Sequence, residues 1–316
     1  MVTTITTLSA ERLRGFIVAR HWQDVGAVYG RGAIQTMSRA RDLERYLLAG
    51  MPRGGYPIHD LVGEDLAAFR AAMVRERVAV GFCPLCAVLL TPPNANVKLD
   101  KSNAYGLSLS PASTSGWNCC RASSAGCRAA CLATAGKGGL DSVQRGRLWK
   151  VALLVAEPAL FVRALADELR RAAGRRPVDT LGRSTGPLVP VRLNVLSDLA
   201  WERVAPALFD IAGLRFYDYT KRTDRTVPAN YHLTSSATER TADSGLADLA
   251  DMYGSNVAVV FDTRRGQALP TSYAGCRVVD GDLSDSRWND DRGVIVGLRA
   301  KGKAIGDRSG FVRSVA

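Results

Sequence analysis

Histidine and long apolar runs are both scarce in this chain of 316 residues. Only three histidines occur, His21, His59 and His232, which nearly excludes a zinc site built mainly from imidazole. No stretch approaches the roughly 20 consecutive apolar residues of a membrane-spanning helix, so we expect no contact with a membrane. The opening residues, MVTTITTLSAERLRGF, lack the basic and apolar segments of a secretory signal, and we therefore expect a cytoplasmic protein.

Acidic side chains are also fewer than basic ones. Lys and Arg together number 42 and Asp and Glu 30, which gives a net charge of +12. Because basic surfaces attract polyanions and the planar guanidinium group of Arg matches phosphate, this surplus predicts nucleic acid, with DNA as the favoured form, as a partner. The alternative is a compositional preference for arginine without a binding role.

The cysteines are unevenly distributed. Four of the seven lie within Gly116 to Leu132, GWNCCRASSAGCRAACL, and the spacing from Cys120 is C-x6-C-x3-C. An odd number of cysteines in a cytosolic protein favours metal or redox chemistry over disulfides. The predicted metal ligands are Cys119, Cys120, Cys127 and Cys131. Three thiolates would hold a [4Fe–4S] cluster with one open iron, and four would form a structural zinc site. The role of Cys83 and Cys86, in FCPLC, is left open.

The pattern of apolar segments predicts an α/β protein. Residues 1–93 read as a small helical N-terminal domain, and 94–316 as alternating strands and helices. Such alternation is typical of a parallel (β/α) barrel or partial barrel, and an open doubly wound sheet is the alternative. Helices are expected from Asp141 to Arg171 with an interruption near Pro158, at Trp201–Ile211 and at Leu246–Tyr253. The predicted strands are Tyr105–Ser110, Val189–Leu196, Arg215–Tyr219, Tyr231–Ser235, Asn256–Phe261, Arg277–Val279 and Val294–Leu298.

Polar side chains follow most of these strands. Because reactive groups of a parallel barrel gather where its strands end, we expect one site there, reached also by the cysteine loop after the first strand. The predicted catalytic residues are Asp198, Glu202, Asp218, Lys221, Asp280 and Asp282. The predicted cofactor-binding residues are Asn194, Ser197, Ser235 and Ser236. Structural roles are the alternatives, since Asp198 could cap a helix and Asp280–Gly281–Asp282 could form a tight turn.

Several segments carry a family resemblance. LNVLSDLAWE, FYDYTKR, NYHLTSSATER, NVAVVF, VVDGD and VIVGLRAKGKA resemble the phage gene product eighty-eight family from about Asn96 onward, which implies a phage or prophage origin. SSAGCRAAC, Ser197–Asp198, Thr220–Lys221–Arg222 and Ser235–Ser236 are more distantly similar to phage-associated radical S-adenosylmethionine proteins. That resemblance implies a [4Fe–4S] cluster after the first barrel strand. The usual C-x3-C-x2-C spacing and a GGEP-like segment are absent, so S-adenosylmethionine is less supported than the cluster.

Three functions follow from these observations. The first is an iron–sulfur, radical-type enzyme that modifies nucleic-acid bases or a nucleotide precursor. The second is a zinc-containing base-exchange enzyme similar to tRNA-guanine transglycosylases, with Asp198 or Asp280 as nucleophile. The third is a nucleic-acid-binding protein without catalysis, in which a metal only supports the fold.

Overall fold

The computed structural model describes residues 89–93, 102–112, 117–140, 143–144, 146–147, 150–151, 154, 158–177, 180 and 185–315. The predicted helical N-terminal domain therefore lies outside the described residues, apart from 89–93. Contacts divide the chain into two units. The first comprises Met1–Val88, Leu109–Cys119 and Asp141–Ala164, and the second Leu89–Ser108, Cys120–Leu140 and Leu165–Ala316.

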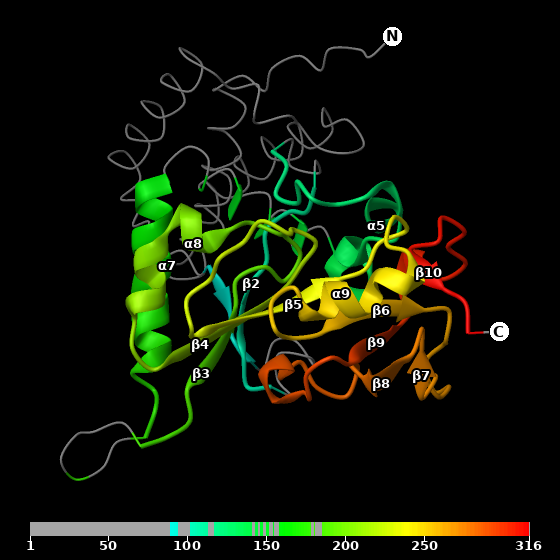
Figure 1. Cartoon of the computed structure of the whole chain (residues 1–316). Helices are drawn as coiled ribbons and strands as arrows, with labels where there is room; N and C mark the ends of the chain where they lie inside the picture. Colours follow the sequence, from blue (N-terminus) through cyan, green and yellow to red (C-terminus); the bar gives the residue numbers. More distant parts are fainter. Residues whose placement is uncertain are drawn as a thin grey trace, which may run out of the picture. The chain divides into compact units, whose positions relative to one another are not determined.

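The second unit is a mixed α/β structure built on one sheet of ten strands among the described residues (Figure 1). Along the sheet the order is β1-β2-β3-β4-β5-β6-β9-β8-β7, and β10 pairs with β6. The strands from β2 to β8 along this path are parallel, as is β10, whereas β1 and β7 are antiparallel to their neighbours. The strands are β1 (Leu90–Thr91), β2 (Tyr105–Leu107), β3 (Val189–Arg192), β4 (Leu214–Thr220), β5 (Tyr231–Ser236), β6 (Val257–Phe261), β7 (Ser272–Tyr273), β8 (Cys276–Asp280), β9 (Ile295–Arg299) and β10 (Val312–Arg313).

All seven predicted strands are confirmed in position, although β2 ends at Leu107 and not at Ser110, and β3 at Arg192 and not at Leu196. Three short strands are additional. Strand β1 lies in the region that the sequence assigned to the N-terminal domain, yet it pairs with β2, so the sheet begins by Leu90. The start of β1 is held by helix α7 (Pro158–Ala173), because Glu168 of that helix accepts hydrogen bonds from the backbone nitrogens of Leu89 and Leu90 at 2.7 and 2.8 Å.

Among the helices whose bounds the structure describes, only α7 (Pro158–Ala173) exceeds six residues. It begins at the predicted interruption, because proline fits the first turn of a helix. The predicted helix Trp201–Ile211 is split, because Pro206 supplies no backbone N–H to continue α8. The remaining elements are α5 (Ala125–Ala129), η4 (Leu132–Thr134), η5 (Gly136–Gly139), α8 (Trp201–Val204), η6 (Pro206–Asp210), η7 (Asp243–Gly245), α9 (Leu246–Asp251), η8 (Arg287–Asn289) and η9 (Gly302–Ala304). No helix among the described residues is long and apolar enough to cross a membrane.

The two faces of the sheet have different coverings, because successive strand residues point to opposite sides. One face carries Phe216 and Tyr231, which pack against Phe209 of η6 with ring centroids 4.6 and 4.9 Å away. Farther along, α9 covers the same face through Leu246 and Ala250. We call this the helix-covered face. The opposite face carries Tyr217 and Tyr219, and the loop after β8 lies against it.

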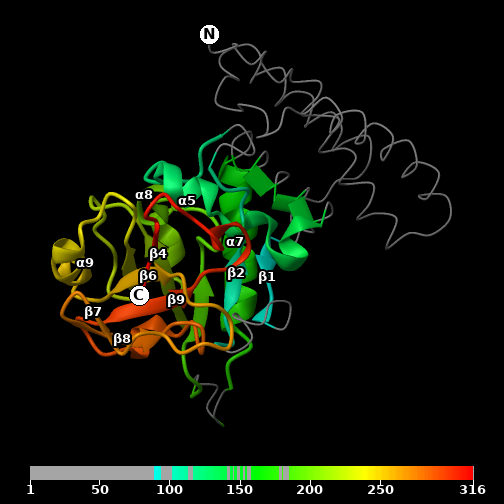
Figure 2. The same cartoon turned by 90° about the vertical axis from the view of Figure 1, so that its right-hand side faces the viewer.

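The sheet is strongly curved. Asp285, after β8, accepts hydrogen bonds from Tyr217 and Tyr219 of β4, and its nitrogen donates to Ser102 Oγ ahead of β2 at 2.9 Å. In a flat sheet, the six strand spacings from β2 to β8 would span about 29 Å. The loop begins with a turn, Leu283 N to Asp280 O, and could not cover that distance. In Figure 2, β2 and β9 accordingly run in clearly different directions.

Curvature of this kind is the part of the barrel prediction that the described residues support. The strand path has two ends, β1 and β7, and no pairing among the described strands joins them. The fold is therefore a curved, mostly parallel sheet, and closure into a barrel is not observed in this part of the chain. We call the edge at which the parallel strands end the carboxyl edge.

Candidate functional site

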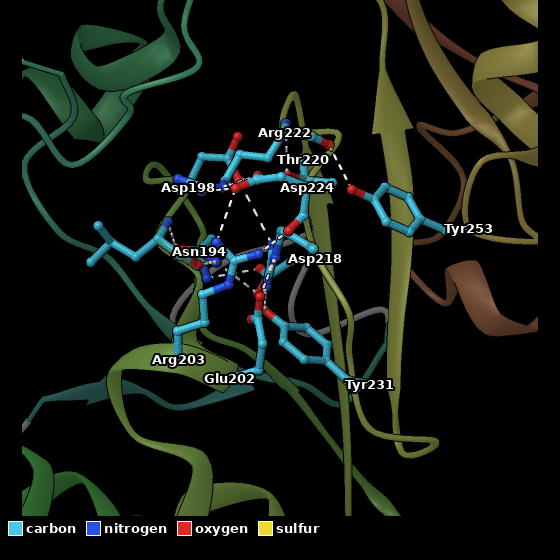
Figure 3. Close-up of polar contacts among 12 residues, drawn as sticks. Asn194, Asp198, Glu202, Arg203, Asp218, Thr220, Arg222, Asp224, Tyr231 and Tyr253 are labelled. Carbon is cyan, nitrogen blue, oxygen red and sulfur yellow. Dashed lines mark hydrogen bonds and ion pairs between the residues drawn. The ribbon is translucent and has the colours of Figure 1, made fainter.

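A buried polar network lies under the helix-covered face where β3 and β4 end (Figure 3). Asn194 donates to Asp218 twice, from its backbone nitrogen at 2.8 Å and from Nδ2 at 3.1 Å. The Tyr231 hydroxyl donates to Asp218 at 2.6 Å, and Asn194 Oδ1 accepts from Ser197 Oγ at 2.8 Å. Asp218 is completely buried, so these donors replace the water that its carboxylate would otherwise bind.

A buried arginine extends this network toward α8. Arg225 donates to Glu202 through Nε at 3.1 Å and Nη2 at 2.7 Å, and its Nη1 lies 3.8 Å from Asp198. Asp198 in turn accepts from Thr220 Oγ1 at 2.7 Å and from the backbone nitrogen of Lys221 at 2.9 Å. We call the connected residues Asn194, Ser197, Asp198, Glu202, Asp218, Thr220, Arg225 and Tyr231 the Asp218 network.

Burial dominates the protonation of this network. It raises the pKa of Asp218 to about 6, although Arg192 and the hydrogen bond from Tyr231 act in the opposite direction. Burial and the neighbouring Asp218 also raise the pKa of Tyr231 well above its usual value, so its hydroxyl stays a donor. Five predicted site residues thus meet here, Asn194, Ser197, Asp198, Glu202 and Asp218. Their oxygens bind internal donors, an arrangement suited to fixing the ends of β3 and β4.

The two predicted catalytic aspartates after β8 belong to another cluster. Asp280 pairs with Arg299 of β9 at 2.8 Å, and Asp282 pairs with Arg299 at 3.3 Å and with Lys301 at 2.5 Å. The hydrogen bond from Arg299 lowers the pKa of Asp280 despite partial burial. These acids therefore connect the carboxyl ends of two neighbouring strands.

The predicted cofactor-binding serines of β5 lie within the sheet. Ser235 pairs with Val257 and Ser236 with Ala258, so both are positioned at the junction of β5 and β6. Ser235 is almost completely buried, and within the described chain its hydroxyl has no hydrogen-bond partner. They do not join the Asp218 network through any hydrogen bond observed among the described residues.

The cysteine loop is anchored at the carboxyl edge, where the sequence placed it. Cys120 Sγ donates to the carbonyl of Leu196 after β3 at 3.3 Å. Glu239, after β5, accepts from Ser124 Oγ at 2.5 Å and from the backbone nitrogen of Gly126 at 2.9 Å. Although burial opposes it, these two hydrogen bonds lower the pKa of Glu239. The loop is therefore fastened to two strand ends.

Close packing explains the glycine in this loop. A Cβ atom on Gly126 would lie 2.4 Å from Ser309 Oγ, 2.7 Å from Glu239 Oε2 and 2.9 Å from Phe311 Cβ. Helix α5 thus enters a narrow gap between the segment after β5 and the segment before β10, and any side chain at this position would force them apart.

The thiols do not form a metal site in the part of the chain that the structure describes. No three His, Cys, Asp or Glu side chains lie close enough there to hold an ion. Cys119 belongs to the first unit, whereas Cys120, Cys127 and Cys131 belong to the second. Cys83 and Cys86 lie outside the described residues. We therefore derive no chemical step through a [4Fe–4S] cluster or a zinc ion, and both stay predictions from the sequence.

Three residues that hold this region together were not predicted as site residues. Arg225, Tyr231 and Arg299 each bind a predicted site residue. A partial signal existed, because acids that follow buried strands need cationic or hydrogen-bonding partners, and TKRTDR supplies cations directly after β4.

The chain matches one known protein family over the residues that form this sheet. Residues 88–314 match the family model described as Gene product 88, a range that includes every strand from β1 to β10. No curated protein and no solved structure among those compared matches the chain.

Proposed function

The chain belongs to the Gene product 88 family, and we propose that it binds nucleic acid at the carboxyl edge of its sheet. The proposal begins with a net charge of +12, which favours association with a polyanion. The distribution of paired and unpaired charges at that edge then provides the more specific argument.

The acids at the carboxyl edge are mostly neutralised by internal partners. Each of five acids forms an ion pair with Arg or Lys within 4 Å, which removes much of the repulsion that a phosphate would meet. They are Asp198, Glu202, Asp224, Asp280 and Asp282.

Several bases at the same edge are not neutralised in this way. Lys221 follows β4, Arg240 follows β5 and Lys303 follows β9, and none of the three forms an ion pair with a described acid. Arg240 and Lys303 are exposed and Lys221 is partly exposed. Two acids at this edge, Glu239 and Asp262, likewise form no ion pair with a described base and accept hydrogen bonds instead. The three unpaired bases, together with the net charge of +12, are the observation that carries the proposal.

The test is binding of labelled DNA to the whole chain, followed by fluorescence anisotropy between about 50 and 200 mM KCl. With three phosphate contacts, we expect the logarithm of affinity to fall against the logarithm of salt with a slope of about −2 for a single strand. Arg240→Gln with Lys303→Gln should reduce both affinity and slope. Arg277→Gln is the control for a charge removed away from this edge, because Arg277 is an exposed base near the start of β8, where it pairs with Asp291. Absence of binding at the lowest salt concentration would remove the proposal.

A base-modifying enzyme is the second candidate, and one observation favours it. The cysteine loop is fastened to the same edge through Leu196 and Glu239, so its thiols lie in the region where we propose that nucleic acid binds. A [4Fe–4S] cluster, zinc and S-adenosylmethionine remain predictions from the sequence, as do a phage origin and a cytoplasmic location.

Metal content separates these enzymatic alternatives. Protein purified without oxygen should contain about four irons per chain if the loop binds a cluster, and Cys127→Ala should lose them. About one zinc per chain would favour base exchange. If neither metal is present in the wild-type protein, the enzymatic candidates lose their support and nucleic-acid binding alone remains.

A further inference from the structure

Lys221 is held in a fixed position at the end of β4. Its backbone nitrogen donates to Asp198 Oδ2 at 2.9 Å, and the preceding Thr220 donates to the other oxygen of that carboxylate at 2.7 Å. The following nitrogen, of Arg222, donates to Thr220 Oγ1 at 3.1 Å. Thr220 and Lys221 are thus tied directly to one buried carboxylate and Arg222 is tied to Thr220, so the base of the Lys221 side chain has little freedom.

The charge of Lys221 differs from that of its neighbours. Arg222 pairs with Asp224 at 2.7 Å and Arg225 pairs with Glu202 at 2.7 Å, whereas Lys221 forms no ion pair with an acid among the described residues. Of the three bases in TKRTDR, Lys221 alone therefore presents an unneutralised charge.

An aromatic ring lies beside this charge. Lys221 Nζ is 6.0 Å from the centroid of the Phe311 ring, at the outer limit of a cation–π contact. Phe311 is partly exposed, and its Cβ lies against Gly126 of the cysteine loop. Its backbone nitrogen donates to Ser309 Oγ at 3.2 Å. The Phe311 side chain also packs against the buried alanines Ala130, Ala300 and Ala304, which limits its movement. The ammonium covers the ring only loosely.

A positioned ammonium next to a partly exposed aromatic ring suits one nucleotide of a single strand. Aromatic rings in such sites stack against an unpaired base, and a nearby cation contacts its phosphate. A base inside a duplex has both faces occupied by its neighbours and cannot stack in this way. Resting on the proposed nucleic-acid binding, we infer that Phe311 and Lys221 form a subsite for single-stranded nucleic acid, with the base on the ring and a phosphate on the ammonium.

The experiment compares one fluorescein-labelled DNA strand of about 12 nucleotides with the same strand annealed to its complement. Phe311→Leu keeps an apolar side chain but removes the ring, and Phe311→Tyr keeps the ring. We expect Phe311→Leu to weaken single-strand binding by about 5- to 150-fold, the range of one lost stacking contact, and duplex binding less than about twofold. Phe311→Tyr should retain wild-type affinity.

Lys221→Gln tests the second half of the subsite. We expect it to weaken binding of the strand at every sequence tested and to reduce the slope of the salt dependence by about 0.7. Arg277→Gln, which removes an equal charge near the amino end of β8, should change the single-strand affinity much less. Thermal unfolding of each variant checks that a loss of binding does not reflect a loss of fold.

The outcomes separate this inference from the proposed function. If the wild-type chain binds neither form of DNA, the proposed function fails. If it binds but Phe311→Leu and Lys221→Gln retain full affinity for the strand, the function stands and the subsite is wrong. Equal losses for strand and duplex in Phe311→Leu would also overturn the stacking role.

Discussion

The two halves of the helix-covered face are built by different physical means. Beneath α9, Val257, Val259 and Ile295 form an apolar cluster with Leu246 and Ala250. At β3, β4 and β5, the Asp218 network places Asp218 and Arg225 at almost no exposure to solvent. Apolar packing is non-directional, whereas hydrogen bonds and ion pairs fix both distance and angle.

The difference indicates where positional accuracy is needed. Buried charges are expensive to remove from water, and a well-packed apolar replacement is often at least as stable. The buried charges of the Asp218 network lie at the end of β4, where Lys221 follows the strand. We interpret the polar half as a support for the carboxyl edge and the apolar half as the main source of stability. The predictions below test this contrast.

The largest effect is expected from Arg225→Ala. Loss of this guanidinium would leave the carboxylates of Glu202 and Asp198 buried without Arg225 as their cation. Removing one partner of a buried ion pair lowers the free energy of unfolding by about 3–5 kcal/mol. Val259→Ala in the apolar half should cost about 2 kcal/mol through lost burial and a small cavity. Urea unfolding measures both. A double variant, Arg225→Met with Glu202→Gln, should recover part of the loss, and equal costs for the two single variants would contradict the contrast.

A pH-dependent effect should follow from Asp218. Its pKa in the folded chain, about 6, lies above the usual 3.8, so folding favours the protonated form. The contribution of this group to stability is therefore fully present below about pH 3.8 and is lost as pH rises through 6, by roughly 3 kcal/mol at most. Asp218→Asn should remove this decline, as seen in the midpoint of urea unfolding measured from pH 4 to 7. Val259→Ala should keep the wild-type profile, and parallel profiles for wild type and Asp218→Asn would contradict the prediction.

The smallest effect concerns the backbone contact that joins the cysteine loop to the strand ends. Gly126→Ala inserts a methyl group against Ser309 and Glu239, and such overpacking typically costs about 1–3 kcal/mol. We expect α5 to separate from Glu239 and the thiols of the loop to react faster with a disulfide reagent. Gly245→Ala is the control, because a Cβ there meets no atom within 4 Å. Unchanged thiol kinetics in Gly126→Ala would show that the contact is not needed.

The sequence identified the strands of this sheet better than the contacts of its site. The segment Val257–Phe261 is apolar throughout, as expected of a parallel strand that is covered on both faces. Strands β1, β7 and β10 have only two residues each, too few for any periodicity to be visible.

The site depends instead on pairs that are distant in sequence. Glu239 binds Ser124 across 115 residues, and Arg225 binds Glu202 across 23. The residue types were visible in the sequence, but which acid met which base was decided by the curvature of the sheet and by the register of its strands. Acids predicted as catalytic are therefore found with internal partners that periodicity and spacing do not reveal.

The strand order has a consequence for the time course of folding. Strand β8 precedes β9 in the chain, yet β9 lies between β8 and β6. The β7–β8 pair therefore cannot join the sheet until β9, synthesised later, has added to β6. Parallel pairings between distant segments form slowly, because chain entropy is lost before the contacts are gained. We expect addition of β9 to limit the rate of refolding, with β7 and β8 the last strands to gain protection from hydrogen exchange.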